Sequence, residues 1–160
     1  MSRGRAGGYT LKLPSEDKHL HSRSEFLADL AVMLAGHAAE KGIFKDITTG
    51  AHSDLAAATK LARQIVTEYG MSEKLGPRTF GQQEEMVFLG REIHERRDYS
   101  EKTAQMIDQE VSALIDKAYE TAQDIIRRKE PSLKKIVSEL LVKETLEQAE
   151  FEAIFKTSTA

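Results

Sequence analysis

The stretch SEKTAQMIDQEVSALIDKAYETAQDIIRRK, residues Ser100–Lys129, decides the fold class. Its apolar residues recur at every third or fourth position, which is the spacing of one face of an α-helix. Ser100 is a favourable N-terminal cap, and the basic residues at the other end suit the negative end of a helix dipole. The sequence therefore predicts one long amphipathic helix, whose buried face carries Ala104, Ile107, Val111, Leu114, Ile115, Ala118 and Ala122.

Two helices are predicted before this one. Ser22–Glu25 fits a capping box, in which a hydroxyl and a carboxylate satisfy free backbone N–H groups at a helix start. The apolar positions that follow wrap far round the helix, so we expect it to be central. His37 lies on this helix and is expected to be a core or boundary histidine rather than a metal ligand. A second helix is predicted from about Ser53 to Tyr69, with Gly70 as its C-terminal glycine.

Two shorter helices are predicted after the long one, and a strand at the N-terminus. Pro131 suits the first position of a helix, and Thr145–Gln148 fits another capping box that opens a last helix ending near Phe155. Gly7–Leu13 alternates with period two before a proline, which is typical of a strand. The expected fold is mainly α, with about five helices and a short N-terminal strand or hairpin.

Composition restricts the function. The chain has 160 residues, a net charge of −3 and no cysteine. We expect a single domain over residues 1–160, with an irregular stretch at 71–98 that separates the helices of 22–70 from those of 100–155. The charge balance gives no reason to expect nucleic acid as a partner. The sequence has no phosphate-binding glycine loop, no Gly-x-Ser-x-Gly motif and no apolar run long enough to cross a membrane.

The segment Thr48–Asp54 is the most informative polar cluster, because it joins a glycine turn to a helix start. One interpretation is structural: Ser53 or Asp54 caps the helix. The other is that Asp54 points into a cleft as an oxygen ligand for a divalent cation. Glu40 ends the preceding helix, where a negative charge is mildly unfavourable, and it could approach the same region. On the residues alone the structural interpretation is favoured, and a solvated Glu40 is the simpler alternative.

Several segments together resemble the FtsH family of ATP-dependent zinc metalloproteases. The most specific is the run VTEYGMSEKLGP at residues 66–77, which looks like a family signature. The resemblance extends over residues 3–155 in the expected order. The other matching segments are Arg3–Thr10, Gly36–Glu40, Thr49–Leu55, Phe88–Glu92, Tyr99–Glu101 and Leu141–Leu146.

The resemblance implies a membrane-anchored homo-hexamer that degrades unfolded or surplus proteins, membrane proteins among them. ATP and magnesium would bind a separate AAA ATPase domain, and zinc would be held by a His-Glu-x-x-His helix and a distant aspartate. Asp54 matches that aspartate, and Glu40 matches a position that would orient a ligand histidine. The helices of 22–70 would then form the zinc site. A bacterial inner membrane, with this domain on the cytoplasmic side, is the implied location, and an organelle membrane is the alternative.

The sequence departs from the family at one decisive motif, because it contains no His-Glu-x-x-His. In the family this helix precedes the segment that resembles Arg3–Thr10, so the general base is expected upstream of Met1. We therefore expect the isolated chain to be inactive, with weak or absent zinc binding. We also expect it to leave Leu30, Leu34 and Ile65 uncovered and to self-associate. The alternative function is a non-catalytic helical oligomerisation module.

Overall fold

The computed structural model describes residues 20–81 and 98–157, and the regular secondary structure of this part of the chain is entirely helical. No β-strand occurs within it, and the strand expected at Gly7–Leu13 lies outside the described residues. The prediction of a mainly α fold with about five helices is confirmed. In chain order the helices are α1 (Arg23–Ala39), α2 (His52–Thr67), α3 (Glu101–Arg128), α4 (Glu130–Lys143) and α5 (Gln148–Thr157).

Helix α1 begins with the predicted capping box. The backbone N–H of Glu25 donates to the Ser22 hydroxyl at 3.3 Å, and the N–H of Ser22 donates to the Glu25 carboxylate at 2.7 Å. At its other end α1 runs into one π-helical turn, Glu40–Phe44. This turn ends at Lys45, whose φ of 58° is left-handed and reverses the chain direction.

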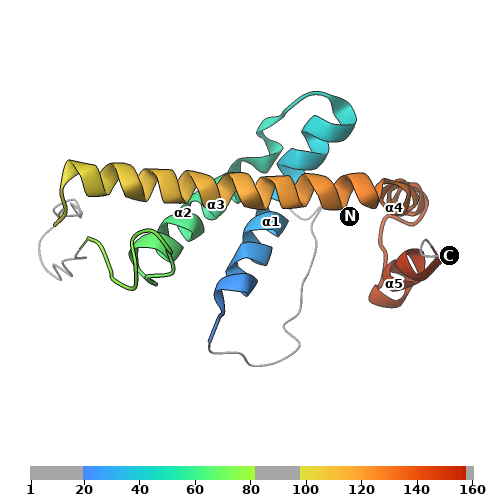
Figure 1. Ribbon diagram of the computed structural model, residues 1–160. Coiled ribbons are helices and arrows are strands. Elements are labelled where there is room, and N and C mark those ends of the chain that lie inside the picture. Colours follow the sequence, from blue (N-terminus) through green and yellow to red (C-terminus); the bar gives the residue numbers. More distant parts are fainter. Residues whose placement is uncertain (1–19, 82–97, 158–160) are drawn as a thin grey trace, which may run out of the picture.

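The core lies where α1 and α2 pack against the long helix α3 (Figure 1). Leu30, Leu34 and Ile65 are 0%, 3% and 0% exposed, so the expectation that they would be uncovered is wrong. Helix α3 covers them, because its apolar face is long enough to contact both α1 and α2. The buried core members are Leu30, Ala31, Leu34, Ala58, Ala62, Ile65, Val66, Leu75, Phe80, Ile107, Leu114 and Ala118.

The chain after α2 is irregular and folds back on that helix. Gly70 has a φ of +59°, a left-handed conformation that glycine adopts without strain. The N–H of Met71 then donates to the Ile65 carbonyl, and the N–H of Phe80 donates to the Thr67 carbonyl. Residues 71–81 thus form part of the irregular stretch expected at 71–98, and residues 82–97 lie outside the described part of the chain.

Helices α4 and α5 lie at the C-terminal end of α3 (Figure 1). Pro131 is in the first turn of α4, as predicted. The capping box expected at Thr145–Gln148 is wrong, because α5 begins only at Gln148. The N–H of Glu147 donates instead to the Glu150 carboxylate at 3.2 Å, so this pair forms the helix start.

Candidate metal-ligand turn

The candidate site is built on the connection between α1 and α2. Its last part is a single 3-10 turn, Thr49–Ala51, which runs directly into α2. Thr48 precedes this turn with extended backbone, and its hydroxyl accepts a hydrogen bond from the N–H of Gly50 at 3.1 Å. A threonine in this position caps the turn by supplying an acceptor for a free backbone N–H.

Glu40 binds this connection with both of its carboxylate oxygens. Oε2 accepts from the backbone N–H of Thr48 at 2.8 Å, and Oε1 accepts from the Thr48 hydroxyl at 2.9 Å. These bonds explain why a carboxylate is tolerated at the end of α1, where the helix dipole disfavours it. The expectation that Glu40 approaches the segment Thr48–Asp54 is therefore confirmed, and a Glu40 that contacts only solvent is ruled out.

The same hydrogen bonds shift the ionisation of Glu40. The backbone N–H of Thr48 is the largest influence, and with the Thr48 hydroxyl it lowers the pKa of the Glu40 carboxyl below its usual value. Both groups donate to the ionised form, which accepts hydrogen bonds more strongly than the neutral acid. Glu40 therefore holds the connection as a carboxylate.

Asp54 lies in the first turn of α2, with its side chain exposed. The N-terminal cap of α2 is Ala51, which makes no side-chain capping bond. The interpretation of Ser53 or Asp54 as the capping residue is therefore wrong. Within residues 20–81 and 98–157, the Asp54 carboxylate takes part in no hydrogen bond or ion pair, so its oxygens remain available to a ligand.

The described residues do not form a complete metal site. No group of three or more histidine, cysteine, aspartate or glutamate side chains in this part of the chain is placed to hold a metal ion. Asp54 fits the requirement for a single ligand, because it is a hard oxygen donor at the surface that has no partner among the described residues. Catalytic zinc needs three protein ligands, so two more would have to come from elsewhere.

His37 is not part of this turn. It is half-buried, and its ring lies 5.6 Å from that of Tyr119 on α3, measured between ring centroids. This confirms the expectation of a core or boundary histidine.

Thr48 is the functional candidate to which the sequence analysis assigned no role. A threonine two residues before a glycine at a helix start is a recognisable hydroxyl-capped turn, and that local pattern could have identified it.

The fold and the turn define a helical domain that carries one candidate metal ligand at the head of a helix. A family model, peptidase family M41, matches residues 1–154. The chain belongs to this family. Within its described residues, no helix has the length and apolar character needed to cross a membrane.

Curated relatives agree with this assignment. The chain is 52% identical over 155 residues to a protein of Thermomicrobium roseum named ATP-dependent zinc metalloprotease FtsH 1. It is 49% identical over 155 residues to the protein of that name from Sphaerobacter thermophilus, and 49% identical over 150 residues to the ATP-dependent zinc metalloprotease FtsH of Thermotoga maritima. These alignments cover 94–97% of this chain but only 24–25% of each relative.

Proposed function

We propose that this chain is the C-terminal part of the peptidase domain of an ATP-dependent zinc endopeptidase, in which Asp54 is one of the three protein ligands of the metal. Two observations support the proposal together. The family match covers residues 1–154, and Asp54 presents an exposed carboxylate in the first turn of α2, with no partner in the part of the chain that the structure describes. Because the Asp54 side chain is exposed, ligands from another segment of the protein could reach the same metal ion.

The chain's own residues have separate roles in this proposal. Asp54 binds the metal and fixes one direction of its coordination shell. Zinc, when bound, supplies Lewis-acid activation of the water and of the peptide carbonyl. No residue of this chain is assigned as the general base, which would lie upstream of Met1 together with the two histidine ligands.

Glu40 would also orient one of those histidines. A carboxylate offers about four acceptor positions, and Thr48 occupies two of them through its N–H and hydroxyl. The remaining positions can accept an imidazole N–H, which fixes the tautomer and ring orientation of a metal-bound histidine. The two tasks of Glu40 are therefore compatible.

One face of α1 is suited to receive the missing helix. Val32 is 67% exposed, and a Cβ placed on Gly36 would meet no atom within 4 Å. These residues lie at intervals of four before Glu40, so all three share one face of the helix. A helix that packs on Val32 and Gly36 would bring its histidines toward the Glu40 carboxylate.

The remaining parts of the proposal concern the whole protein. Membrane anchoring, a homo-hexamer with an AAA ATPase domain that binds ATP and magnesium, and a cytoplasmic position at a bacterial inner membrane or an organelle membrane follow from the family resemblance. Unfolded or surplus proteins, membrane proteins among them, would be the substrates. The isolated chain, with one ligand and no base, would be inactive and bind zinc weakly or not at all.

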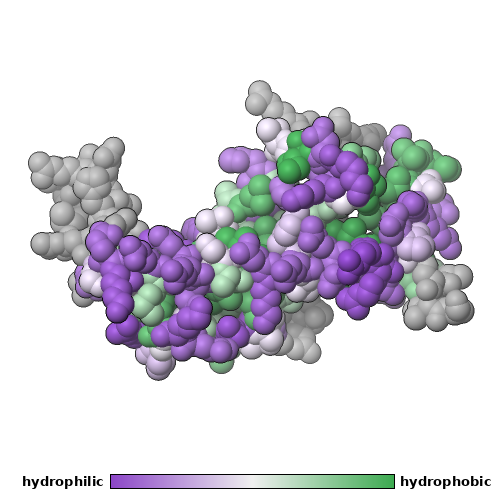
Figure 2. Space-filling model, turned by 45° about the horizontal axis from the view of Figure 1, so that its top comes forward, coloured by the Kyte–Doolittle hydropathy of each residue, from purple (hydrophilic) through white to green (hydrophobic). Residues whose placement is uncertain are grey.

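The alternative is a non-catalytic helical oligomerisation module. It is favoured by exposed apolar side chains on α4, where Leu141 and Val142 are 81% and 82% exposed. Figure 2 shows hydrophobic patches separated by polar surface on the face in view. Light scattering on the isolated chain tests this alternative, and a strictly monomeric chain would contradict it.

The decisive experiment compares Asp54→Asn with Asp108→Asn in the full-length enzyme. Asp108 is an exposed aspartate on α3 and serves as the matched control. We expect Asp54→Asn to abolish both stoichiometric zinc binding and casein hydrolysis, and Asp108→Asn to retain both. Full zinc content and activity in Asp54→Asn would refute the proposal.

A further inference from the structure

We infer that Thr48 is a positioning residue for Asp54: its single hydroxyl joins the end of α1 to the start of α2 and so fixes where the metal-binding carboxylate lies. The inference rests on the proposed function, since it requires Asp54 to be a ligand. It adds a residue that makes no contact with the metal.

The argument starts from the two directions in which the Thr48 hydroxyl bonds. As a donor it reaches Oε1 of Glu40 at 2.9 Å, and as an acceptor it receives the N–H of Gly50 at 3.1 Å. The Thr48 backbone N–H adds the 2.8 Å bond to Oε2 of Glu40. The hydroxyl therefore links a charged group on one helix to the turn that begins the next.

Helix α2 has no side-chain cap of its own that could replace this link. Its cap residue is Ala51, and the N–H of His52 donates back to the carbonyl of Thr49 inside the same turn. The direction of the first turn of α2 therefore depends on how residues 49–51 are held. The hydrogen bonds that join Thr48 to Glu40 and to Gly50 are called the Thr48 clamp below. Asp54 lies in the first turn of α2, so a movement of this clamp moves the Asp54 carboxylate.

The clamp is tightly packed as well as hydrogen-bonded. A Cβ on Gly50 would lie 3.2 Å from the Thr48 hydroxyl and 3.3 Å from Oε1 of Glu40. Both distances are shorter than ordinary van der Waals contact, so the turn has little room to shift while the clamp is formed. Metal ligands are sensitive to such displacements, because supporting hydrogen bonds set the orientation of the donor atoms.

The test uses Thr48→Val, which keeps the shape of the side chain and removes both hydroxyl bonds. Thr48→Ser keeps the hydroxyl and is the rescue variant. Thr59→Val is the matched control, because it removes a threonine hydroxyl that bonds a backbone carbonyl at 2.8 Å on the same helix α2, away from Glu40. Zinc affinity is measured for each full-length variant by competition with a chelator, and thermal unfolding is measured without metal.

We expect Thr48→Val to weaken zinc binding about 10- to 100-fold, the range typical for loss of a group that orients a ligand. Thr48→Ser should recover wild-type affinity. Thr59→Val should keep wild-type zinc affinity even where its metal-free unfolding temperature falls as much as that of Thr48→Val. This pattern separates positioning from general stability. If Thr48→Val does not fold without metal, Gly50→Ala is measured instead, since it strains the same clamp and should also weaken zinc binding.

Two results overturn the inference, and they are distinguishable. Unchanged zinc affinity in Thr48→Val, together with loss of zinc in Asp54→Asn, would refute the positioning role and leave the proposed function intact. Equal loss of affinity in Thr48→Val and Thr59→Val would refute it in the same way. Unchanged zinc affinity in Asp54→Asn would refute the proposed function, and the inference with it.

Discussion

The Ser72 hydroxyl donates a 2.7 Å hydrogen bond to Oε2 of Glu110, and the Lys74 ammonium lies 2.8 Å from Oε1 of the same carboxylate. Both donors belong to the run at residues 66–77 that carries the family resemblance. The Ser72 hydroxyl also accepts a hydrogen bond from the N–H of Leu75. The same hydroxyl therefore stabilises the turn at residues 72–75 and connects this turn to α3. The run thus fastens the irregular chain after α2 to the middle of α3.

Substitution of Glu110 should therefore destabilise the protein. The Glu110 side chain is 13% exposed, and Glu110→Gln removes a charge that satisfies one buried hydroxyl and one ammonium. We expect a loss of about 1–3 kcal/mol in the free energy of unfolding, the usual cost of disrupting a hydrogen bond to a charged group. Urea denaturation measures it. Glu120→Gln, an exposed position on the same helix, is the control and should leave the midpoint unchanged.

The stability contribution of Glu110 should depend on pH with a defined sign. The Lys74 hydrogen bond is the largest influence and lowers the pKa of the Glu110 carboxyl, against an opposing effect of burial. A group with a lower pKa in the folded state stabilises the fold above its unfolded pKa of about 4.3, and this contribution disappears as the pH falls through the folded pKa. Urea midpoints of the wild type should therefore fall more steeply than those of Glu110→Gln below about pH 4.3. Parallel curves for the two proteins would contradict the assignment.

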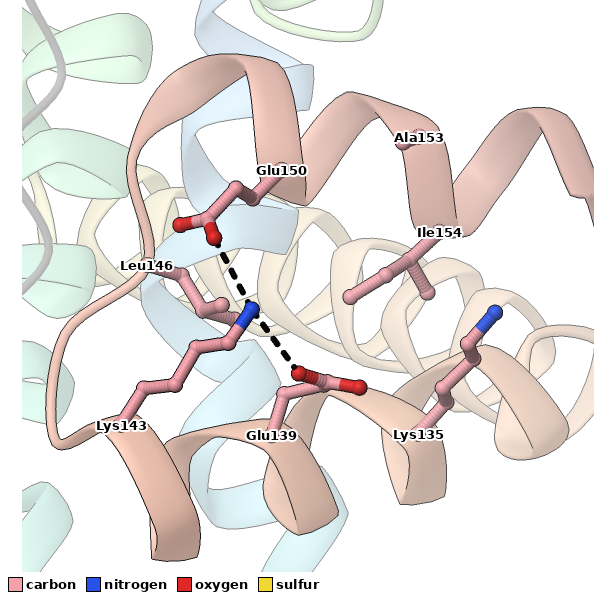
Figure 3. A pocket seen from close by; sticks show the side chains of 7 residues that line it. All are labelled: Lys135, Glu139, Lys143, Leu146, Glu150, Ala153 and Ile154. Atoms are coloured by element: carbon pink, nitrogen blue, oxygen red, sulfur yellow. Dashed lines mark hydrogen bonds and ion pairs between the residues drawn. The ribbon is translucent and has the colours of Figure 1, made fainter.

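Lys143 ties α5 to α4 through two carboxylates. Its ammonium lies 3.2 Å from Oε2 of Glu139 on α4 and 2.9 Å from Oε1 of Glu150 on α5. Figure 3 shows the Lys143 side chain between these two carboxylates. Lys143→Met should open α5 locally while changing the global unfolding free energy by less than about 1 kcal/mol, because exposed ion pairs contribute little. Amide hydrogen exchange in α5 measures this opening. Lys135→Met is the control, because Lys135 lines the pocket between α4 and α5 together with Lys143. Among the residues that the structure describes, Lys135 forms no ion pair with α5, so its substitution should leave that exchange unchanged.

Helix positions were predictable where the determinants are local. The Ser22 capping box and the apolar face of α3 depend on residues within a few positions of each other, and both are observed. The capping box predicted at Thr145 is not formed, because Glu147 and Glu150 offer a competing helix start whose first residue lies two positions later. The exposure of Leu30 was misjudged because its covering partner, α3, lies more than 70 residues away along the chain.

The site was predictable only in part. Asp54 is identified as a metal ligand only through the family resemblance. Residue type alone does not distinguish an aspartate that binds a metal from an aspartate that caps a helix. The bonds from Glu40 to Thr48 cross a reversal of the chain at Lys45. No sequence pattern specifies how a π-helical turn of five residues will redirect the backbone. The pairing of Ser72 with Glu110 spans 38 positions and depends on tertiary packing.

Two glycines should respond to alanine in opposite directions. Gly70 is left-handed at φ +59°, and an added Cβ would lie 3.0 Å from the backbone nitrogen of Arg78. Gly70→Ala should cost about 1–2 kcal/mol for the left-handed conformation, with the close contact adding to it. Gly36 lies inside α1 with nothing within 4 Å of an added Cβ, so Gly36→Ala in this chain should stabilise it by about 0.5–1 kcal/mol. Thermal unfolding of both variants measures the difference. A gain of stability in Gly70→Ala would show that the turn after α2 relaxes freely, which its hydrogen bonds from Met71 to Ile65 and from Phe80 to Thr67 argue against.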